Sequence, residues 1–272
     1  MYNESSLIPS VFTKVSAHAR SHPTWLYRFV DDGSTDGTPD VIEELLREPN
    51  CPPNIILLRR TPNTGKATVI QQSMLSAQEE HLLFTDGDLA YPLELLDQLN
   101  DQLSTYDVVI GSRTLANTPQ TNIRLVRRIL GGGFNFLVRA LTGTKHHDTQ
   151  AGLKGFRNIP ANALFRRQKV RNFAFDAELI FLAHRLNLRV GEIAATVEPS
   201  HSYKKSKMNL LKDPPRMLMS IVKMRITHRG AKWNDENPVD ADPEVRIEIC
   251  PEAQGLVSST PSHEPAEIGA EN

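Results

Sequence analysis

Strand-like and helix-like segments alternate along residues 25–112, and this alternation limits the possible folds more than any other feature. Short apolar runs rich in β-branched and aromatic residues predict strands at 25–30, 54–60, 81–86 and 106–112. Amphipathic segments predict the helices between them, at 39–48, 65–78 and 92–103. Strands joined by helices form parallel sheets with right-handed crossovers. The sequence therefore predicts an α/β fold with a mostly parallel sheet flanked by helices.

The two ends of this pattern differ. Towards the C-terminus, two further strands are predicted at 151–157 and 188–199, with a helix at 175–187 between them. At the N-terminus, the helical segment 6–20 has no strand before it, although a parallel sheet normally has a strand that leads into its first helix. We therefore expect either a sheet that lacks one strand or a chain that is shortened at its N-terminus.

Charge is distributed unevenly along the 272 residues. Residues 229–272 carry about -7, and because the whole chain carries -1, residues 1–228 carry about +6. The acidic segment is rich in Pro, Glu, Ser and Asp without periodicity, which predicts a disordered tail after one folded domain at 1–228. A mildly basic domain suits a phosphate-bearing or anionic partner. Aromatic residues make up only 6% and form no stacking platform, so no nucleic-acid partner is expected.

Nothing in the sequence predicts secretion or a membrane span. Cys51 and Cys250 lie far apart and form no disulfide framework, which favours a reducing, cytoplasmic compartment. No apolar run reaches the roughly 18–20 residues of a transmembrane helix, and the first residues do not form a signal peptide. Residues 123–143 mix apolar side chains with four arginines. This mixture is typical of a peripheral segment at a membrane surface, or of an ordinary pair of surface helices.

Two carboxylates follow the strand predicted at 81–86. Asp86 and Asp88 are two residues apart in the segment FTDGDLAYP, so both can approach one divalent cation. Oxygen ligands of this kind suit Mg²⁺ or Mn²⁺, which keep several waters and bridge to phosphate groups. Asp-Gly-Asp is also common in polar turns, so the pair alone does not establish a metal site.

A second acidic pair, Asp31 and Asp32, ends the strand predicted at 25–30 and begins the segment DDGSTDGT. These carboxylates can accept hydrogen bonds from a base N–H or from a ribose hydroxyl. The alternative is a turn between strand and helix, in which Asp36 or Thr38 caps the helix that follows.

Taken together, these motifs resemble glycosyltransferase family 2, the inverting enzymes with the Rossmann-like GT-A fold that use nucleotide sugars. The resemblance extends from Tyr2 to about Arg225. It rests on YNE at 2–4, VDDGSTDGT at 30–38, NTGKA at 63–67 and TDGDLAYP at 85–92. Later motifs are similar to the branch that contains dolichyl-phosphate β-glucosyltransferase and dolichyl-phosphate mannose synthase. These are GSR at 111–113, DTQAGLKGF at 148–156, FAFDAELI at 173–180 and SKMNLLKDPPRML at 206–218.

The resemblance implies a role for each matching residue on the donor side. Tyr2 and Glu4 match positions beside the nucleotide, and Asp32, with Asp31, matches the acids that hold base and ribose. Lys66 matches a position near the donor. The pair that binds the metal and the diphosphate corresponds to Asp86 and Asp88.

On the acceptor side, the resemblance implies a second group of residues. Arg113 and Lys207 match basic positions that face the acceptor phosphate or the donor diphosphate in lipid-phosphate transferases. Asp148 and Gln150 match a stretch that lines the sugar and the acceptor. Together with Asp88, the residues Arg113, Asp148 and Lys207 are the expected catalytic residues.

The expected reaction transfers a hexose from UDP-glucose, or from GDP-mannose, to a polyprenyl phosphate such as dolichyl phosphate. A phosphate oxygen is already anionic near neutral pH, so basic residues, as in the stretch 201–225, matter more than a general base. A saccharide acceptor would instead require a carboxylate base, for which Asp148 and Asp176 are candidates. The third alternative is an inactive module that only binds the nucleotide sugar, because family members usually carry a central strand before YNE.

Overall fold

The computed structural model describes residues 1–116, 139, 143–146, 148–198 and 213–230. The segment 123–143, the basic stretch 201–225 and the tail 229–272 therefore lie wholly or partly outside the described residues. Strands and helices alternate as predicted up to residue 112. In chain order the elements are α1 (Ile8–Ser21), β1 (Tyr27–Asp32), α2 (Thr38–Leu46), β2 (Ile55–Arg60), α3 (Lys66–Leu75), β3 (His81–Thr85), α4 (Glu94–Gln102), β4 (Val108–Ser112), β5 (Leu153–Arg157), α6 (Asn158–Arg167), α7 (Phe175–Arg185), β6 (Val190–Ala194) and α8 (Asp213–Thr227).

Strands β1 and β2 pair in parallel, from Tyr27 opposite Ile55 to Asp32 opposite Arg60. Alternate side chains of β2 point to opposite faces, as the two-residue period of a strand requires. Ile55 and Leu57 pack with helices α1 and α2, whereas Ile56 and Leu58 belong to a separate small cluster on the other face, where α3 lies. Because both faces are covered, β2 reads as a continuous apolar run rather than as an alternating one.

The other four strands form a mixed sheet in the order β3-β5-β4-β6. Strand β4 is parallel to β6, but β5 runs antiparallel to both β3 and β4. The prediction of a mostly parallel sheet was wrong at this strand. The crossover rule applies only to strands joined by a helix that returns the chain to the same end, and the sequence between β4 and β5 shows no such strand–helix alternation.

The two sheets are not paired with each other among the described residues. Instead, the first residue continues the hydrogen bonding of β1: the amino group of Met1 donates to the Val30 carbonyl at 2.5 Å, and the Asp32 amide donates to the Met1 carbonyl at 2.9 Å. The Met1 side chain also contacts Gly87, in the loop after β3. Met1 therefore lies between the carboxyl ends of β1 and β3.

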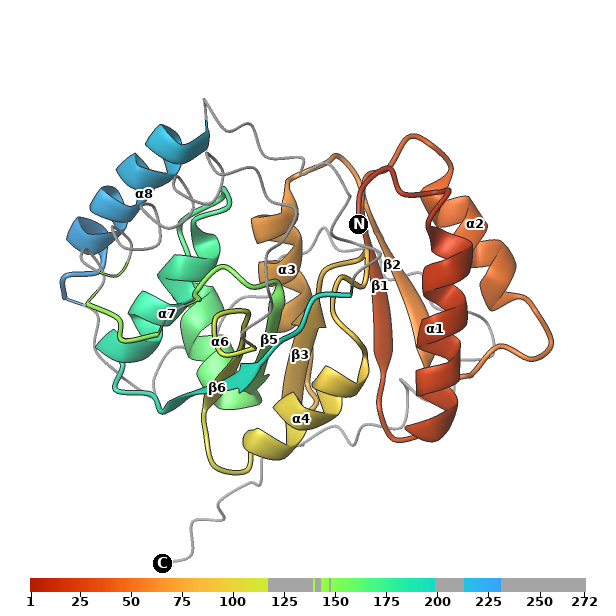
Figure 1. The fold of residues 1–272 in the computed structure, drawn as a ribbon. Helices are drawn as coiled ribbons and strands as arrows, with labels where there is room; N and C mark the ends of the chain where they lie inside the picture. The colour runs from red at the N-terminus through yellow and green to blue at the C-terminus, as the bar shows by residue number, and fades with distance from the viewer. Residues whose placement is uncertain (117–138, 140–142, 147, 199–212, 231–272) are drawn as a thin grey trace, which may run out of the picture.

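Helices cover both faces of the sheets (Figure 1). Helices α3, α6, α7 and α8 share one apolar cluster with β3, β4 and β5, centred on Phe156, Phe165 and Phe175. Helix α4 covers the opposite face of the four-stranded sheet, where Leu99 and Leu103 are fully buried. No helix of the described ranges combines the length and the apolarity that crossing a bilayer requires.

Candidate active site

The loop after β3 carries the predicted metal pair. Thr85 ends the strand opposite Leu153 of β5, and the Asp86 amide donates to the Gly152 carbonyl at 3.0 Å. The Asp86 carbonyl accepts from the Leu89 amide at 2.9 Å, and Leu89 adopts a left-handed backbone conformation with φ of 49°. This tight turn places both carboxylates at the carboxyl end of β3.

Lys66, the first residue of α3, reaches this loop. Its Nζ lies 2.5 Å from Oδ1 of Asp86. Burial alone would lower the pKa of the Lys66 ammonium, but Asp86, Asp176 and Asp88 together raise it above its ordinary value. Lys66 therefore stays protonated, and the structure brings together two predicted site residues that are 20 positions apart in the sequence.

Gly152 packs directly against the Asp86 carboxylate. A Cβ built on Gly152 would lie 2.1 Å from Oδ2 of Asp86, far inside van der Waals contact. We expect Gly152→Ala to displace the Asp86 side chain and to lower the turnover rate by about 10²-fold, because an error of about 1 Å in the position of a catalytic group costs that much. Steady-state kinetics at saturating metal would measure the loss.

The matched control is Gly230→Ala, where an added Cβ meets no atom within 4 Å and the backbone is not left-handed. Wild-type turnover in Gly152→Ala would show that Asp86 does not have to occupy this position.

Arg113 and Asp148 form the second charged group of the site. The Arg113 Nε and Nη2 donate to the two Asp148 oxygens at 2.7 and 2.8 Å, and the Arg113 amide donates to Oδ2 at 3.0 Å. Burial alone would raise the pKa of Asp148, but its hydrogen bonds and ion pair with Arg113 hold that pKa below its usual range. Asp148 is thus a fixed anion that orients a guanidinium rather than a group poised to accept a proton.

Tyr91 connects these two charged groups, although it was not predicted as a site residue. Its side chain is buried, and burial is the main cause that raises the pKa of the phenol to about 12. Arg113 lowers this pKa, while Asp148 and Asp86 raise it further. Strands β3 and β4 both run antiparallel to β5, so their carboxyl ends, followed by Asp86 and Arg113, lie at the same edge of the sheet.

The acidic pair at the end of β1 is buried and already hydrogen-bonded. Asp31 accepts from the amide and the hydroxyl of Ser34, at 3.0 and 2.5 Å. Asp32 accepts from the amides of Thr64 and Gly65, both at 2.8 Å. These carboxylates hold the DDGS turn and the NTGK loop in place, and Gly33, with φ of 71°, permits the two loops to meet.

The YNE segment lies against the DDGSTDGT turn, as the resemblance implies. Asn3 exchanges hydrogen bonds with Ser34 and Thr35, and the Glu4 amide donates to Oγ1 of Thr38 at 2.9 Å. The Tyr2 side chain is 40% exposed. Tyr2 and Glu4 are therefore carried by backbone contacts to the place where Asp31 and Asp32 end β1.

Two other predicted residues are less well placed by the structure. The Gln150 amide donates to Oδ1 of Asp148 at 3.3 Å, and its side-chain Nε2 is buried without a hydrogen-bond partner. Lys207 lies outside the described residues, so its predicted place in the site stays a prediction.

Lys154 and Asp176 form a buried ion pair, of which the sequence analysis singled out only Asp176. The Lys154 Nζ lies 2.5 Å from Oδ1 of Asp176 and donates to the Ala151 carbonyl at the same distance, with the Lys154 side chain fully buried. Asp176 is a candidate base for a saccharide acceptor, but its buried contact with Lys154 favours a structural role. The signal that could have predicted this pair is the single lysine in the apolar segment AGLKGF, because a buried lysine needs a partner.

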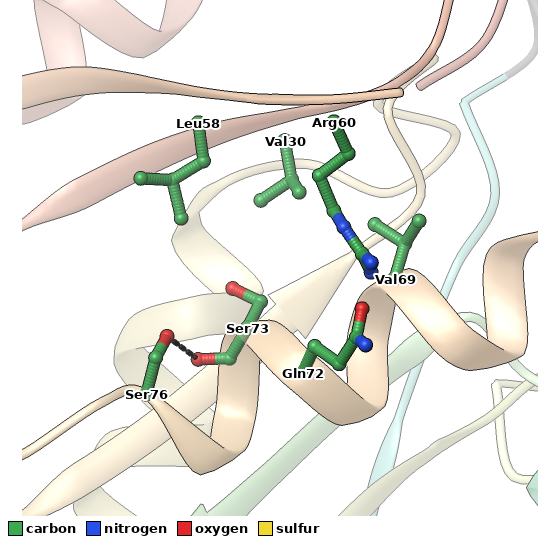
Figure 2. A pocket seen from close by; sticks show the side chains of 7 residues that line it. All are labelled: Val30, Leu58, Arg60, Val69, Gln72, Ser73 and Ser76. Atoms are coloured by element: carbon green, nitrogen blue, oxygen red, sulfur yellow. Dashed lines mark hydrogen bonds between the residues drawn. The ribbon is translucent and has the colours of Figure 1, made fainter. Parts of the chain in front are cut away.

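A small pocket lies between β1, β2 and α3 (Figure 2). Its lining is mainly apolar or hydroxylated, and none of the predicted site residues belongs to it: Val30, Leu58, Arg60, Val69, Gln72, Ser73 and Ser76. The pocket therefore belongs to the packing of α3 against the sheet rather than to the acidic site.

The donor atoms of Asp86 and Asp88 fit a hard divalent cation. Both residues offer only carboxylate oxygens, and the Lys66 ammonium on Asp86 shows that this carboxylate already faces a cation. Mg²⁺ and Mn²⁺ are bound through one or two carboxylates together with substrate phosphates, so two protein ligands suffice for either ion.

Several known proteins with similar sequences carry the same name. A dolichyl-phosphate beta-glucosyltransferase of Trichomonas vaginalis is 27% identical over 252 residues, which cover 88% of this chain and 73% of the relative. The Drosophila melanogaster dolichyl-phosphate beta-glucosyltransferase is 34% identical over 207 residues, covering 71% and 63%. The human enzyme of that name is 27% identical over 207 residues, covering 71% and 64%.

Solved structures confirm an α/β fold that resembles GT-A glycosyltransferases. Mannosyl-3-phosphoglycerate synthase from Rubrobacter xylanophilus superposes with a TM-score of 0.57 at 14% identity, covering 92% of this chain and 83% of that one. Glucosyl-3-phosphoglycerate synthase from Mycobacterium tuberculosis, in complex with Mn²⁺, UDP-glucose and glycerol 3-phosphate, gives 0.52 at 14% identity, covering 94% and 88%. The model of the family Glycosyl transferase family 2 matches residues 1–173. With this match over more than half of its length, the chain belongs to glycosyltransferase family 2 and is a glycosyltransferase.

Proposed function

We propose that this chain transfers a hexose, glucose from UDP-glucose in the first place, to a polyprenyl phosphate of the dolichyl phosphate type, with inversion at the sugar carbon. The observation that carries the proposal is the pairing of Lys66 with Asp86 and of Arg113 with Asp148 at the carboxyl ends of β3 and β4. Such a site holds an anionic donor and a second anion side by side. The names of the relatives, all dolichyl-phosphate beta-glucosyltransferases, support this acceptor and this sugar.

The donor half of the site rests on Asp86, Asp88 and Lys66. We propose that the two carboxylates hold Mg²⁺ or Mn²⁺, as the Mn²⁺ and UDP-glucose complex of the structural neighbour supports. The bound cation would neutralise the charge that develops on the leaving diphosphate. The Lys66 ammonium holds Asp86 in place and adds a positive charge at the same point.

The nucleoside would lie between the YNE segment and the DDGS turn. Since the Asp32 carboxylate is engaged by the NTGK loop, its proposed contribution is to fix the loop that starts α3 and carries Lys66. Asp31 does the same for the turn at Ser34. Tyr2, which is half-exposed, and Glu4 then supply the surface that faces the base and the ribose.

The acceptor half rests on Arg113. Asp148 uses both its oxygens to fix the guanidinium in one plane, while the guanidinium side chain remains 38% exposed and can meet a phosphate. A phosphate nucleophile is already anionic, so the fixed Asp148 anion need not act as a base. Gln150, with a buried amide nitrogen that has no partner, and Lys207 complete the proposed acceptor side.

Incubation of the purified chain with labelled UDP-glucose, Mg²⁺ or Mn²⁺ and a short polyprenyl phosphate tests the proposal. We expect a labelled product that partitions into chloroform. Labelled GDP-mannose in a parallel reaction distinguishes the two donors, and a soluble oligosaccharide in place of the lipid tests the saccharide acceptor. Donor binding by calorimetry with no transfer to any acceptor would contradict the proposed activity and leave a nucleotide-sugar-binding module.

The two parallel N–H donors of the Arg113 guanidinium give a further prediction. Arg113→Lys keeps the charge but loses the planar pair of N–H donors, so we expect kcat/KM for the polyprenyl phosphate to fall by about tenfold or more, the equivalent of losing one charge-assisted hydrogen bond. The apparent affinity for UDP-glucose, measured by calorimetry without acceptor, should change much less. An equal loss on both substrates would place Arg113 at the donor diphosphate instead.

A further inference from the structure

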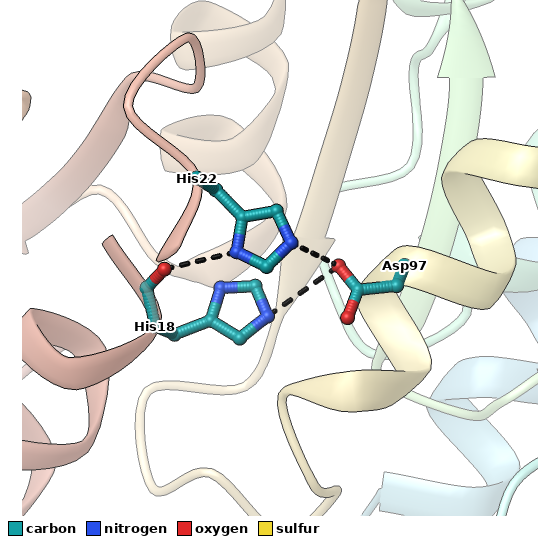
Figure 3. Close-up of side chains that lie close together, drawn as sticks. All are labelled: His18, His22 and Asp97. Carbon is teal, nitrogen blue, oxygen red and sulfur yellow. Dashed lines mark hydrogen bonds and ion pairs between the residues drawn. The ribbon is translucent and has the colours of Figure 1, made fainter. Parts of the chain in front are cut away.

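Three metal-ligating side chains meet between the C-terminal end of α1 and the first turn of α4 (Figure 3). His18 and His22 lie one turn apart on α1 and just after its end, and Asp97 comes from α4. The Nε2 atoms of the two rings lie 3.5 and 3.0 Å from Oδ1 of Asp97. The three ligand atoms lie within 4.8 Å of one another.

The tautomer of His22 directs a lone pair at this carboxylate. The Nδ1 of His22 lies 2.9 Å from the His18 carbonyl, which can only accept a hydrogen bond, so Nδ1 carries the proton. In the neutral ring, Nε2 then presents a lone pair to Oδ1 of Asp97 at 3.0 Å. Two lone pairs at this separation repel each other unless a proton or a metal cation lies between them.

His18 also presents its Nε2 to Asp97, and its other ring nitrogen is held by a hydrogen bond. Its Nδ1 lies 2.6 Å from the Tyr27 hydroxyl, an oxygen partner of the kind that orients a metal-binding imidazole. Its side chain is only 8% exposed, and its Nε2 is buried without a hydrogen-bond partner, as is Oδ1 of Asp97. Nε2 of His18 and Oδ1 of Asp97 thus lie close to each other, yet neither atom has a hydrogen-bond partner.

Protonation of both imidazole rings would not be a favourable way to pair these atoms. The two rings are stacked with their centroids 4.2 Å apart, so two imidazolium charges would repel. A single divalent cation is the charge that all three ligands can share.

We propose that His18, His22 and Asp97 bind one zinc-like divalent cation, Zn²⁺ or in its place Co²⁺, which joins α1 to α4. Two imidazole nitrogens and one carboxylate oxygen form a common zinc ligand set, and they favour this class of ion over Mg²⁺. At a Zn–N distance of about 2.1 Å, tetrahedral ligands lie roughly 3.4 Å apart, which agrees with the ligand spacing here. This nitrogen-containing site differs in chemistry from the oxygen pair of Asp86 and Asp88.

The ion would connect the two separate sheets. Helix α1 packs in the apolar cluster of β1 and β2, whereas α4 packs in the cluster of β4, β5 and β6. Among the described residues the sheets themselves share no strand pairing. Since the YNE segment leads into α1 and the Asp86–Asp88 loop leads into α4, a cation at this place would also fix the two parts of the donor site relative to each other.

Calorimetric titration of the EDTA-treated full chain with Zn²⁺, without any nucleotide sugar, tests the proposal. We expect one saturable site, and a Co²⁺ complex with the visible absorption bands of tetrahedral coordination. Trp25 offers an independent signal because its ring lies 4.9 Å from that of His22, so Co²⁺ should quench its fluorescence in a Trp233→Phe background. Absence of saturable binding would overturn the proposal.

Matched variants locate the site. His22→Asn and Asp97→Asn change partly exposed ligands and should weaken Zn²⁺ binding by more than the roughly 10- to 100-fold expected for Tyr27→Phe, which removes only a partner of a ligand. His81→Asn, which changes a histidine outside the cluster, and Asp88→Asn should retain the wild-type affinity. Unchanged affinity in both His22→Asn and Asp97→Asn, or loss in Asp88→Asn alone, would place the zinc elsewhere. Because no donor is present, these results are independent of the proposed transferase activity.

Discussion

Asp88→Asn is expected to lower metal-dependent hexosyl transfer by about 10²- to 10³-fold, the loss typical of removing one group that stabilises developing negative charge. The substitution removes one of the two anionic ligands from the loop after β3. The fold should persist, because the side-chain Oδ1 that accepts from the Ala90 amide at 3.3 Å is still present in asparagine. Initial rates across a Mn²⁺ titration, with circular dichroism to check the fold, would measure the effect.

Asp101→Asn supplies the control, since Asp101 is an exposed acid on α4 and undergoes the same change of charge and shape. The two variants together separate a site effect from a general effect of net charge. If Asp88→Asn shows the wild-type rate at every Mn²⁺ concentration, the assignment of the metal to this loop is wrong.

Lys154→Met is expected to cost about 3–5 kcal/mol in the free energy of unfolding, the usual penalty for leaving one partner of a buried ion pair uncompensated. Asp176 is almost fully buried, and Lys154 is its ion-pair partner at 2.5 Å. The lysine also donates a hydrogen bond to the carbonyl of Ala151. Ala151 directly precedes Gly152, which packs against the Asp86 carboxylate. Urea denaturation of the purified chain would measure the loss.

Lys145→Met tests the same substitution at an exposed position, where we expect a change within about 0.5 kcal/mol. The double variant Lys154→Met with Asp176→Leu should regain most of the lost stability, because apolar pairs often replace buried ion pairs without cost. A Lys154→Met variant as stable as the wild type would mean that the pair contributes nothing, and equal losses in single and double variants would attribute the cost to packing.

Sequence patterns predicted most of the strands because each pattern is local. Four strands and three helices within residues 25–112 occur where hydrophobic periodicity places them, with ends shifted by a few residues. Helix α6 (Asn158–Arg167) was not predicted, and the direction of β5 was predicted wrongly. Direction depends on the route of a long connection, and no short-range pattern encodes that route.

The candidate site was predicted in its parts rather than in its contacts. The motifs indicated Asp86, Lys66 and Arg113 separately, but only the fold shows Lys66 on Asp86 and Arg113 on Asp148. Asp31 and Asp32 illustrate the limit. A pair of acids after a strand suggests ligand binding, whereas their oxygens are engaged by neighbouring turns through backbone amides that have no residue signature.

The Arg113–Asp148 pair joins two residues that are 35 positions apart in the sequence, one directly after β4 and one shortly before β5. The entropic cost of closing a loop grows only slowly with its length. An insertion between the two residues is therefore expected to add little to that cost while the Arg113–Asp148 pair still joins the two ends.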